Sequence, residues 1–226
     1  MNNVKLIPDK YYHIYNRGVN GTNLFHDTLS YAYFYNLLEK YIKPVAYIYA
    51  WVLMPNHFHL LIKIKKELMY KYTEGNTDFS PKVFKDIKWQ TVEWSESADL
   101  NLTGRSDKLM GERMHLKLPN NHFHFSHSFN SYTRYHNKRF NREGRLFEKS
   151  FKKKLITNKN NLKQVLLYIH NNPVHHGFCE HAMDYPWSSY LTYVSVGNKE
   201  IENKDAIGWF DDEANFRNMH NQRLKY

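Results

Sequence analysis

The sequence is poor in several features that would place it in a particular class. It has a single cysteine, Cys179, which excludes an internal disulfide and fits a reducing cytosol. No apolar run approaches the roughly 18 residues that a membrane span needs, and residues 1–18 lack the apolar stretch of a signal peptide. We therefore expect a cytoplasmic protein without membrane contact, folded as a single domain over residues 1–226.

Positive charge is what the chain has in excess. Lysine and arginine number 32 against 22 aspartates and glutamates, which gives a net charge of +10 and a pI of about 9.4. Hydrophobic residues make up 42% of the chain, enough for a packed core. Because phosphates attract cations and bases stack on aromatic rings, a basic chain rich in Tyr, Phe, Asn and His indicates a nucleic-acid partner. A protein that is merely basic fits the charge equally well.

The first part of the chain has the clearest pattern. Residues 10–17 are rich in β-formers and predict a strand. Residues 28–43 predict a helix with an apolar stripe at i, i+3, i+4 and i+7. Residues 45–54 and 57–64 predict two adjacent strands, because Pro55-Asn56 between them is a turn signal. This hairpin is the strongest local prediction. The stripe of the helix consists of Phe34, Leu37, Leu38 and Tyr41.

Three more elements are predicted in the second half. Aromatic residues at helical spacing predict a helix over 127–141, and residues 145–156 predict a strand with a lysine run. Residues 159–171 predict a strong helix, which we expect Pro173 to end. The apolar stripe of this last helix consists of Leu162, Val165, Leu166 and Ile169.

Two segments have no clear pattern. Residues 65–125 mix Gly, Ser, Asp, Asn and Lys with scattered aromatics, and we expect a large insertion that is partly helical and partly loop. So long an irregular connection is either functional or mobile. The tail from about residue 180 is expected to be irregular, with a short amphipathic end at 211–225.

The predicted order gives the fold class. The first six elements run β-α-β-β-α-β, which is the ferredoxin-like arrangement of an α+β protein with an antiparallel sheet. The helix over 159–171 is an addition at the C-terminal side. This fold hosts many functions, so the chemistry must be argued from side chains.

A histidine pair lies on the second strand of the hairpin. Residues two apart on a strand point to the same face, so His57 and His59 share a face and Phe58 takes the other, with Leu60, Ile62 and Ile64. Neutral imidazole is a common ligand of divalent metals, and the pair can converge on one ion. From the pattern alone, two histidines lining a half-exposed sheet are an equal alternative.

A second histidine group occurs near the end of the insertion. His122 and His124 form another His-x-His pair, with His115 and His127 nearby. Because the surrounding sequence is unpatterned, we expect mainly surface residues or a DNA contact, with a structural zinc site as the minority alternative.

One tyrosine stands beside the apolar stripe of the last predicted helix. At about 100° per residue, Tyr168 shares a polar flank with Asn161, Gln164 and Asn172. A tyrosine there can present its hydroxyl to a site. An ordinary amphipathic tyrosine is the alternative, and Asn172 before Pro173 can equally be a helix-end cap.

Four segments, in order and at matching spacing, resemble the single-tyrosine HUH transposases, especially the branch associated with repetitive extragenic palindromes. They correspond to the opening strand, the HUH strand, the tyrosine helix and the segment after it, and the resemblance covers roughly residues 11–64 and 126–193. The segments are Tyr12–Gly18, Trp51–Leu61, Tyr168–Gly177 and Tyr185–Tyr190.

This resemblance implies a ferredoxin-like enzyme that cleaves and rejoins single-stranded DNA near hairpins or palindromic repeats. Tyr168 would become linked to a 5′ phosphate and leave a free 3′ hydroxyl. His57 and His59 would hold Mg²⁺ or Mn²⁺, and Asn172 matches the polar position one turn past the tyrosine that completes the metal site. The implied partner is single-stranded or hairpin DNA, which would make the protein nucleoid-associated, and it would act as a monomer or homodimer.

Basic residues near the predicted strand ends are candidates for tracking a phosphate backbone. A solvated basic face is the alternative for each one singly. The candidates are Arg17, Arg139, Arg142, Arg145, Lys152, Lys153 and Lys154.

Two other functional classes remain open. One is a domesticated DNA-binding protein that keeps the fold without transposition. The other is a zinc-dependent hydrolase using the histidine-rich segments, although the sequence has no HExxH motif.

Overall fold

The computed structural model describes residues 5–66, 68–73, 88–91, 107–109, 112–117, 119–195 and 201–222, and over 68–117 it describes the backbone. The core sheet has the strand order β2-β3-β1-β8, and each neighbouring pair is antiparallel. With a helix after the first strand and another before the last, this is the predicted ferredoxin-like α+β arrangement. The four strands are β1 (Tyr11–Arg17), β2 (Ala46–Met54), β3 (His57–Ile64) and β8 (Lys152–Ile156).

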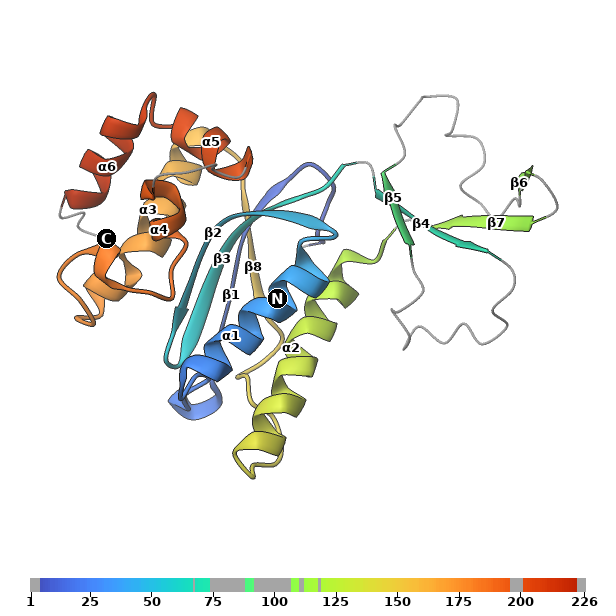
Figure 1. The fold of residues 1–226 in the computed structure, drawn as a ribbon, viewed down its shortest axis with the longest axis horizontal. Helices are drawn as coiled ribbons and strands as arrows, with labels where there is room; N and C mark the ends of the chain where they lie inside the picture. Colours follow the sequence, from blue (N-terminus) through green and yellow to red (C-terminus); the bar gives the residue numbers. More distant parts are fainter. Residues whose placement is uncertain are drawn as a thin grey trace.

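Two helices cover one face of the core sheet, side by side (Figure 1). The first, α1 (Thr28–Leu37), begins at Asp27, whose carboxylate accepts from the backbone N–H of Ser30 at 2.8 Å. It runs on into the π-helical turn η2 (Leu38–Ile42), so the predicted helix over 28–43 is present in two parts. The second, α2 (Asn121–Arg139), begins six residues earlier than the predicted bound of 127. Between these helices and the sheet lies an aromatic core with Phe34, Phe58 and Tyr132. A short 3₁₀ turn, η1 (Val19–Gly21), follows β1.

The C-terminal helices cover the other face (Figure 1). They begin with α3 (Lys159–His175) and continue into the region where we expected an irregular tail. That expectation was wrong, because the tail is helical and buries Tyr193, Phe210 and Phe216 against α3 and β2. Its helices are too short to show a period. They are η5 (Ala182–Asp184), α4 (Tyr190–Val194), α5 (Ile201–Gly208) and α6 (Glu213–Asn221), the last within the predicted amphipathic end. Among the helices of the described residues, none has the length and apolarity that crossing a bilayer requires.

Helix α3 runs through Pro173, which we expected to end it. A proline inside a helix removes one backbone hydrogen bond, and here burial of the ring offsets that loss. The helix ends instead at His175, and Gly177 follows the capping residue with φ +71°. The Gly177 N–H donates to the Val174 carbonyl and the Phe178 N–H to the Pro173 carbonyl, which is a Schellman ending.

The predicted strand over 145–156 is shorter than expected. Regular pairing starts only at Lys152, and residues 145–151 form an irregular segment that runs along the end of β1. The Val19 N–H donates to the Leu146 carbonyl and the Glu148 N–H to the Arg17 carbonyl. These isolated bonds hold the segment in place without a continuous ladder, and we call residues 145–151 the edge segment.

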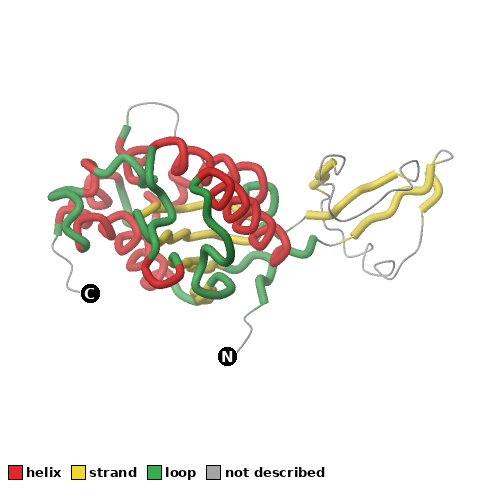
Figure 2. The backbone as a smooth tube through the Cα atoms, turned by 90° about the horizontal axis from the view of Figure 1, so that it is seen from below, coloured by secondary structure: helices red, strands yellow, loops and turns green. Residues whose placement is uncertain are grey.

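The insertion contains a second sheet with the order β5-β4-β7-β6. We expected helix and loop here, and the strands are three to six residues long, which is too short for a periodic pattern. Figure 2 shows this sheet apart from the helices and core sheet. Its strands are β4 (Leu68–Thr73), β5 (Lys88–Thr91), β6 (Asp107–Leu109) and β7 (Glu112–Lys117).

Candidate active site

The turn between β2 and β3 is fixed by the segment that follows β1. The backbone N–H groups of Leu24 and Phe25 donate to the Pro55 carbonyl at 2.6 and 3.0 Å, and the Gly18 N–H donates to the Asn56 carbonyl at 2.8 Å. Gly18 must be glycine, because a Cβ there would lie 1.9 Å from the Thr22 carbonyl oxygen. The start of β3 is therefore held in place by backbone contacts.

The alternation predicted for β3 is confirmed. His57 and His59 lie on the face covered by α3, opposite Arg17 and Tyr15 of β1 in the antiparallel register. The Tyr15 and His59 rings are stacked with centroids 5.6 Å apart. The other face of β3 is buried in the aromatic core through Phe58, Leu60, Ile62 and Ile64.

Helix α3 brings the tyrosine to the histidines. The ring centroid of Tyr168 lies 5.3 Å from that of His59 and 6.0 Å from that of His13. One turn further on, the Asn172 Oδ1 lies 3.0 Å from His57 Nε2. Residues that are more than 100 positions apart in the sequence thus meet at one place through the docking of α3 on the sheet.

His57, His59 and Tyr168 line a cleft of about 510 Å³. Besides the histidines and the tyrosine of the sequence motifs, the cleft is lined by aromatic, cationic and carboxylate side chains. Its further lining residues include Tyr15, Arg17, Asn56, Glu148, Lys152, His176 and Phe178.

The His57 ring lies between two amide oxygens. Asn56 Oδ1 is 2.7 Å from its Nδ1 and Asn172 Oδ1 is 3.0 Å from its Nε2, and the shorter contact favours the proton on Nδ1. Burial lowers the pKa of His57, and it lowers that of His59 well below its ordinary value. Both rings are therefore neutral near pH 7. With the proton on Nδ1, His57 Nε2 keeps its lone pair and faces Asn172 Oδ1.

His13 contacts the second ring of the pair. Its Nε2 lies 2.9 Å from His59 Nδ1, and both rings are buried. Burial, followed by the charge of Lys154, lowers the pKa of His13 to about 4. A proton on His59 Nδ1 would bond to His13 and leave His59 Nε2 with its lone pair. Sequence reasoning did not select His13, although its place two residues before Tyr15 puts it on the same face.

The donor set fits a divalent cation. Adjacent ligands of an octahedral ion at about 2.1 Å lie about 3 Å apart, and His57 Nε2 and Asn172 Oδ1 are separated by 3.0 Å. Asn172 is 1% exposed, so its amide contacts the side chains of the site rather than solvent. The part of the chain that is described holds no cluster of three His, Cys, Asp or Glu side chains suited to a metal, so the fit depends on the asparagine amide.

Tyr168 is protonated in the resting protein. Burial raises the pKa of its phenol, and the hydrogen bond with the Asn172 side chain acts in the opposite direction. Asn172 thus contacts both the tyrosine and His57. This position explains why a residue before a proline stays in the helix, where its amide is held over β3 rather than serving as an end cap.

The fold places the seven basic residues selected from the sequence in different surroundings, and only some of them line the cleft. Arg17 and Lys152 line the cleft, and the Lys152 Nζ lies 5.5 Å from the centroid of the Tyr15 ring. Lys154 pairs with His13 across β1 and β8, whereas Lys153 lies over the Phe151 ring on the other side.

The three arginines behave differently. Arg139 forms an ion pair with Asp27 at 2.6 Å, and Arg142 donates to the Asn137 side chain and the Arg145 carbonyl. The Arg145 side chain lines another cleft, beside α2. Arg139 and Arg142 are therefore engaged within the protein.

The second histidine group does not lie in irregular sequence as expected. His122, His124 and His127 belong to α2, and His124 is 1% exposed with its Nδ1 at 3.0 Å from the Tyr41 carbonyl. The expectation of a surface residue was wrong for His124, because the helix starts at Asn121 and turns it into the core. The side chain of His115 is outside the described part of the chain.

Comparison with known proteins supports the fold. No protein-family model matches the chain, and no curated protein does. Among solved structures, the chain is similar to that of a REP-associated tyrosine transposase bound to a REP hairpin. The match has 15% identity and a TM-score of 0.52, and it covers 90% of this chain and 89% of that one. The chain therefore shares its α+β fold with a tyrosine transposase.

Proposed function

We propose that this protein cleaves and rejoins single-stranded DNA at hairpin or palindromic repeat sequences, with Tyr168 as the nucleophile. The observation that carries the proposal is the meeting of Tyr168 with His57 and His59 at one cleft, where Asn172 Oδ1 lies 3.0 Å from His57 Nε2. The similar solved structure is a tyrosine transposase that binds a REP hairpin, which supports the same class of substrate.

The reaction exchanges one phosphate ester for another. Tyr168 Oη attacks the phosphorus, an Oη–P bond forms and the P–O3′ bond breaks. The product is a 5′-phosphotyrosine and a free 3′ hydroxyl. The phenol proton passes to water in the cleft, and the leaving 3′ oxygen takes one up. Because the phosphotyrosine conserves the ester bond, a 3′ hydroxyl can reverse the step and rejoin DNA without another energy source.

A divalent ion, Mg²⁺ or Mn²⁺, would be held by His57, His59 and Asn172, and when bound it would stabilise the negative charge that builds on the phosphate oxygens. The surrounding side chains orient these ligands. Asn56 holds the His57 proton on Nδ1, and His13 can do the same for His59. Such orientation of ligand tautomers is a general feature of metal sites.

Substrate binding follows from the other residues of the cleft. Arg17 and Lys152 supply positive charge within the cleft. Tyr15 is stacked against His59, and Phe178 is 55% exposed at the edge of the cleft. Aromatic rings of this kind stack on unpaired bases, which favours a single strand over a paired duplex at the cleavage point.

The test is covalent capture. The protein is incubated with Mn²⁺ and an end-labelled DNA hairpin that has single-stranded tails, and products are separated under denaturing conditions. We expect a protein–DNA adduct on Tyr168 by mass spectrometry, and none with Tyr168→Phe. Tyr47→Phe is the matched control, since Tyr47 is an exposed tyrosine at the other end of the sheet.

The outcomes separate the candidate functions. An adduct on another tyrosine, or cleavage by Tyr168→Phe, would refute the assignment of the nucleophile. DNA binding without any adduct would favour the domesticated binding protein. Cleavage that needs zinc and gives no adduct would favour the hydrolase.

A further inference from the structure

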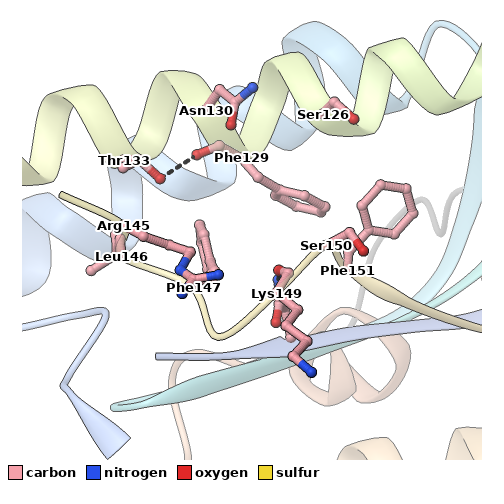
Figure 3. Close-up of a pocket in the computed structure, with 11 residues that line it drawn as sticks. Ser126, Phe129, Asn130, Thr133, Arg145, Leu146, Phe147, Lys149, Ser150 and Phe151 are labelled. Carbon is pink, nitrogen blue, oxygen red and sulfur yellow. Dashed lines mark hydrogen bonds between the residues drawn. The ribbon is translucent and has the colours of Figure 1, made fainter. Parts of the chain in front are cut away.

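A second cleft, of about 410 Å³, lies between helix α2 and the edge segment (Figure 3). We call it the α2 cleft. Its volume falls within the range of sites that bind small organic groups. None of the proposed catalytic groups lines it, so it requires a separate explanation.

The floor of the α2 cleft is aromatic. Figure 3 shows the Phe129 ring reaching from α2 toward the edge segment, with the Phe151 ring beside it at a centroid distance of 5.4 Å. Phe129, Phe147 and Phe151 are 4%, 7% and 6% exposed, so each keeps a small accessible area at the base of the cleft. A flat apolar group can contact these rings without disturbing the core.

The rim of the α2 cleft is polar and positively charged. Asn130 is exposed on α2, and its amide makes no hydrogen bond within the described residues. A side-chain amide offers a donor and an acceptor side by side, which matches the edge of a nucleobase. Arg145 and Lys149 line the same cleft, and neither pairs with a carboxylate in the described part of the chain. The matching ligand has a flat ring, a hydrogen-bonding edge and a negative charge. A nucleotide has all three.

The α2 cleft adjoins the tyrosine cleft. Asn16 lines both, and its Nδ2 donates to the Lys149 carbonyl at 3.1 Å. In the edge segment Glu148 lines the tyrosine cleft, whereas its neighbours Phe147 and Lys149 line the α2 cleft. The ammonium group of Lys149 points away from α2 (Figure 3). A DNA strand that crosses the edge segment would therefore pass from one cleft to the other along cationic side chains.

We propose that the α2 cleft binds one unpaired nucleotide of the DNA strand whose phosphate lies at Tyr168. The base rests over the aromatic floor with its edge at Asn130, and its phosphate lies at Arg145. The inference rests on the proposed function and deepens it, since it assigns a place where base identity outside the tyrosine cleft is recognised. Residues on α2, rather than the histidine site, would then set part of the target preference.

The experiment measures binding in EDTA, where cleavage is not required. Wild-type protein is titrated into a fluorescein-labelled DNA hairpin with single-stranded tails, and an abasic nucleotide is placed at each tail position in turn. We expect one position at which loss of the base weakens binding about 10-fold. With Asn130→Ala, binding of the intact hairpin weakens about 5- to 20-fold, and the abasic nucleotide at that position then changes binding by less than about 2-fold.

Two variants serve as matched controls. Asn218→Ala removes an exposed amide from α6 and Lys138→Ala removes an exposed cation from α2, and both should bind like the wild type. Arg145→Ala should reduce the salt dependence of binding by about one phosphate contact. Circular dichroism confirms that each variant is folded.

Equal abasic profiles for the wild type and Asn130→Ala, or unchanged affinity in Asn130→Ala, would overturn the inference. If the profiles differ as expected but no adduct forms with Mn²⁺, the nucleotide site stands and the nicking function fails. If no DNA binds even at low salt, both proposals are wrong.

Discussion

Two buried histidine pairs lie on opposite sides of helix α3. They differ in whether the surrounding donors and acceptors are matched in hydrogen bonds. On one side, His170 and His220 join α3 to α6, with His170 Nδ1 at 2.9 Å from His220 Nε2. On the other side, His13 and His59 are joined at the same distance, 2.9 Å, with His57 nearby. Burial lowers the pKa in every case. Neither burial nor neutrality therefore distinguishes the two pairs.

The pair beside α6 is part of a closed chain of donors and acceptors. His220 Nδ1 donates to the Phe216 carbonyl at 2.7 Å, so its Nε2 accepts from His170 Nδ1. His170 Nε2 then accepts from the Ser189 hydroxyl at 2.8 Å, and Ser189 accepts from the Trp51 N–H at 2.9 Å. Every polar atom in this chain has a partner, as a structural role requires.

His57 beside the cleft has more acceptors around it than protons to share. Its neutral ring carries one N–H between two amide oxygens, Asn56 Oδ1 at 2.7 Å and Asn172 Oδ1 at 3.0 Å, beside a cleft of about 510 Å³. Matching each donor with an acceptor therefore distinguishes a binding site from a structural network, even when both are built of histidines. We expect a cation to be required on one side of α3 and to have no effect on the other.

The largest effect should come from His59→Ala. Loss of a ligand should weaken Mn²⁺ binding by more than about 100-fold, since even outer-shell changes cost about 10- to 100-fold. Adduct formation should become undetectable. The fold should be retained, although removing the buried ring that contacts His13 should lower the midpoint of thermal unfolding without metal. Calorimetric titration with Mn²⁺ measures the first effect, and wild-type affinity in this variant would remove His59 from the site.

Acid should destabilise both histidine pairs, and Mn²⁺ should protect only one. In the unfolded chain these histidines bind protons near pH 6.5, whereas folded His220 and His13, one from each pair, bind them near pH 4. Their contribution to stability is therefore complete above pH 6.5 and is lost as the pH falls toward 4. Each such group costs about 2 kcal/mol at pH 5.

Urea unfolding at pH 7 and pH 5, with and without Mn²⁺, checks this expectation. Bound metal should raise stability at pH 7 and still do so at pH 5, because the lowered pKa values of His57 and His59 weaken the competition from protons. Stability that does not fall between pH 7 and pH 5 would contradict the lowered pKa values.

His220→Ala should mainly affect stability. The change leaves a small cavity and a buried His170 donor without its acceptor, which together cost about 2–4 kcal/mol of unfolding free energy. Mn²⁺ affinity should stay within about 2-fold of wild type, since the cleft ligands are untouched. Asn218→Ala, on the exposed side of the same helix, is the control. A large loss of Mn²⁺ affinity in His220→Ala would show that the two pairs are coupled through α3.

His13 tests whether the cleft pair depends on orientation. His13→Leu removes the partner of His59 Nδ1 and should weaken Mn²⁺ binding about 10- to 100-fold. His13→Gln keeps an acceptor there and should restore most of the affinity. Equal affinities for the two variants would mean that His13 only fills space beside the site.

The smallest effect is expected in the salt dependence of DNA binding. Here an arginine that lines the cleft is compared with one that is ion-paired within the protein. Arg17→Ala should lower the salt dependence of DNA binding by about one phosphate contact. Arg139→Ala should leave it unchanged, because Arg139 is held by Asp27 at 2.6 Å. Binding curves from low to moderate salt measure both slopes, and equal reductions would show that the ion pair opens on DNA.

The sequence alone determined the elements and faces that local periodicity controls. Alternation over 57–64 placed His57 and His59 on one face, and helical spacing placed Tyr168 and Asn172 on one flank. These follow because side-chain direction repeats every two residues on a strand and every 3.6 on a helix. The β-α-β-β-α-β order followed from the same periodicities.

Only the tertiary structure decided which polar side chains have a hydrogen-bond or ion-pair partner. His13 meets His59 across 46 positions and Asn172 meets His57 across 115, through strand register and helix docking that no local pattern encodes. The same holds for Arg139 with Asp27 and for the helical tail that secures His170. A hydrogen bond needs both partners at the right distance and angle. Long-range packing supplies that, and it separates the histidines of the cleft from those of the core.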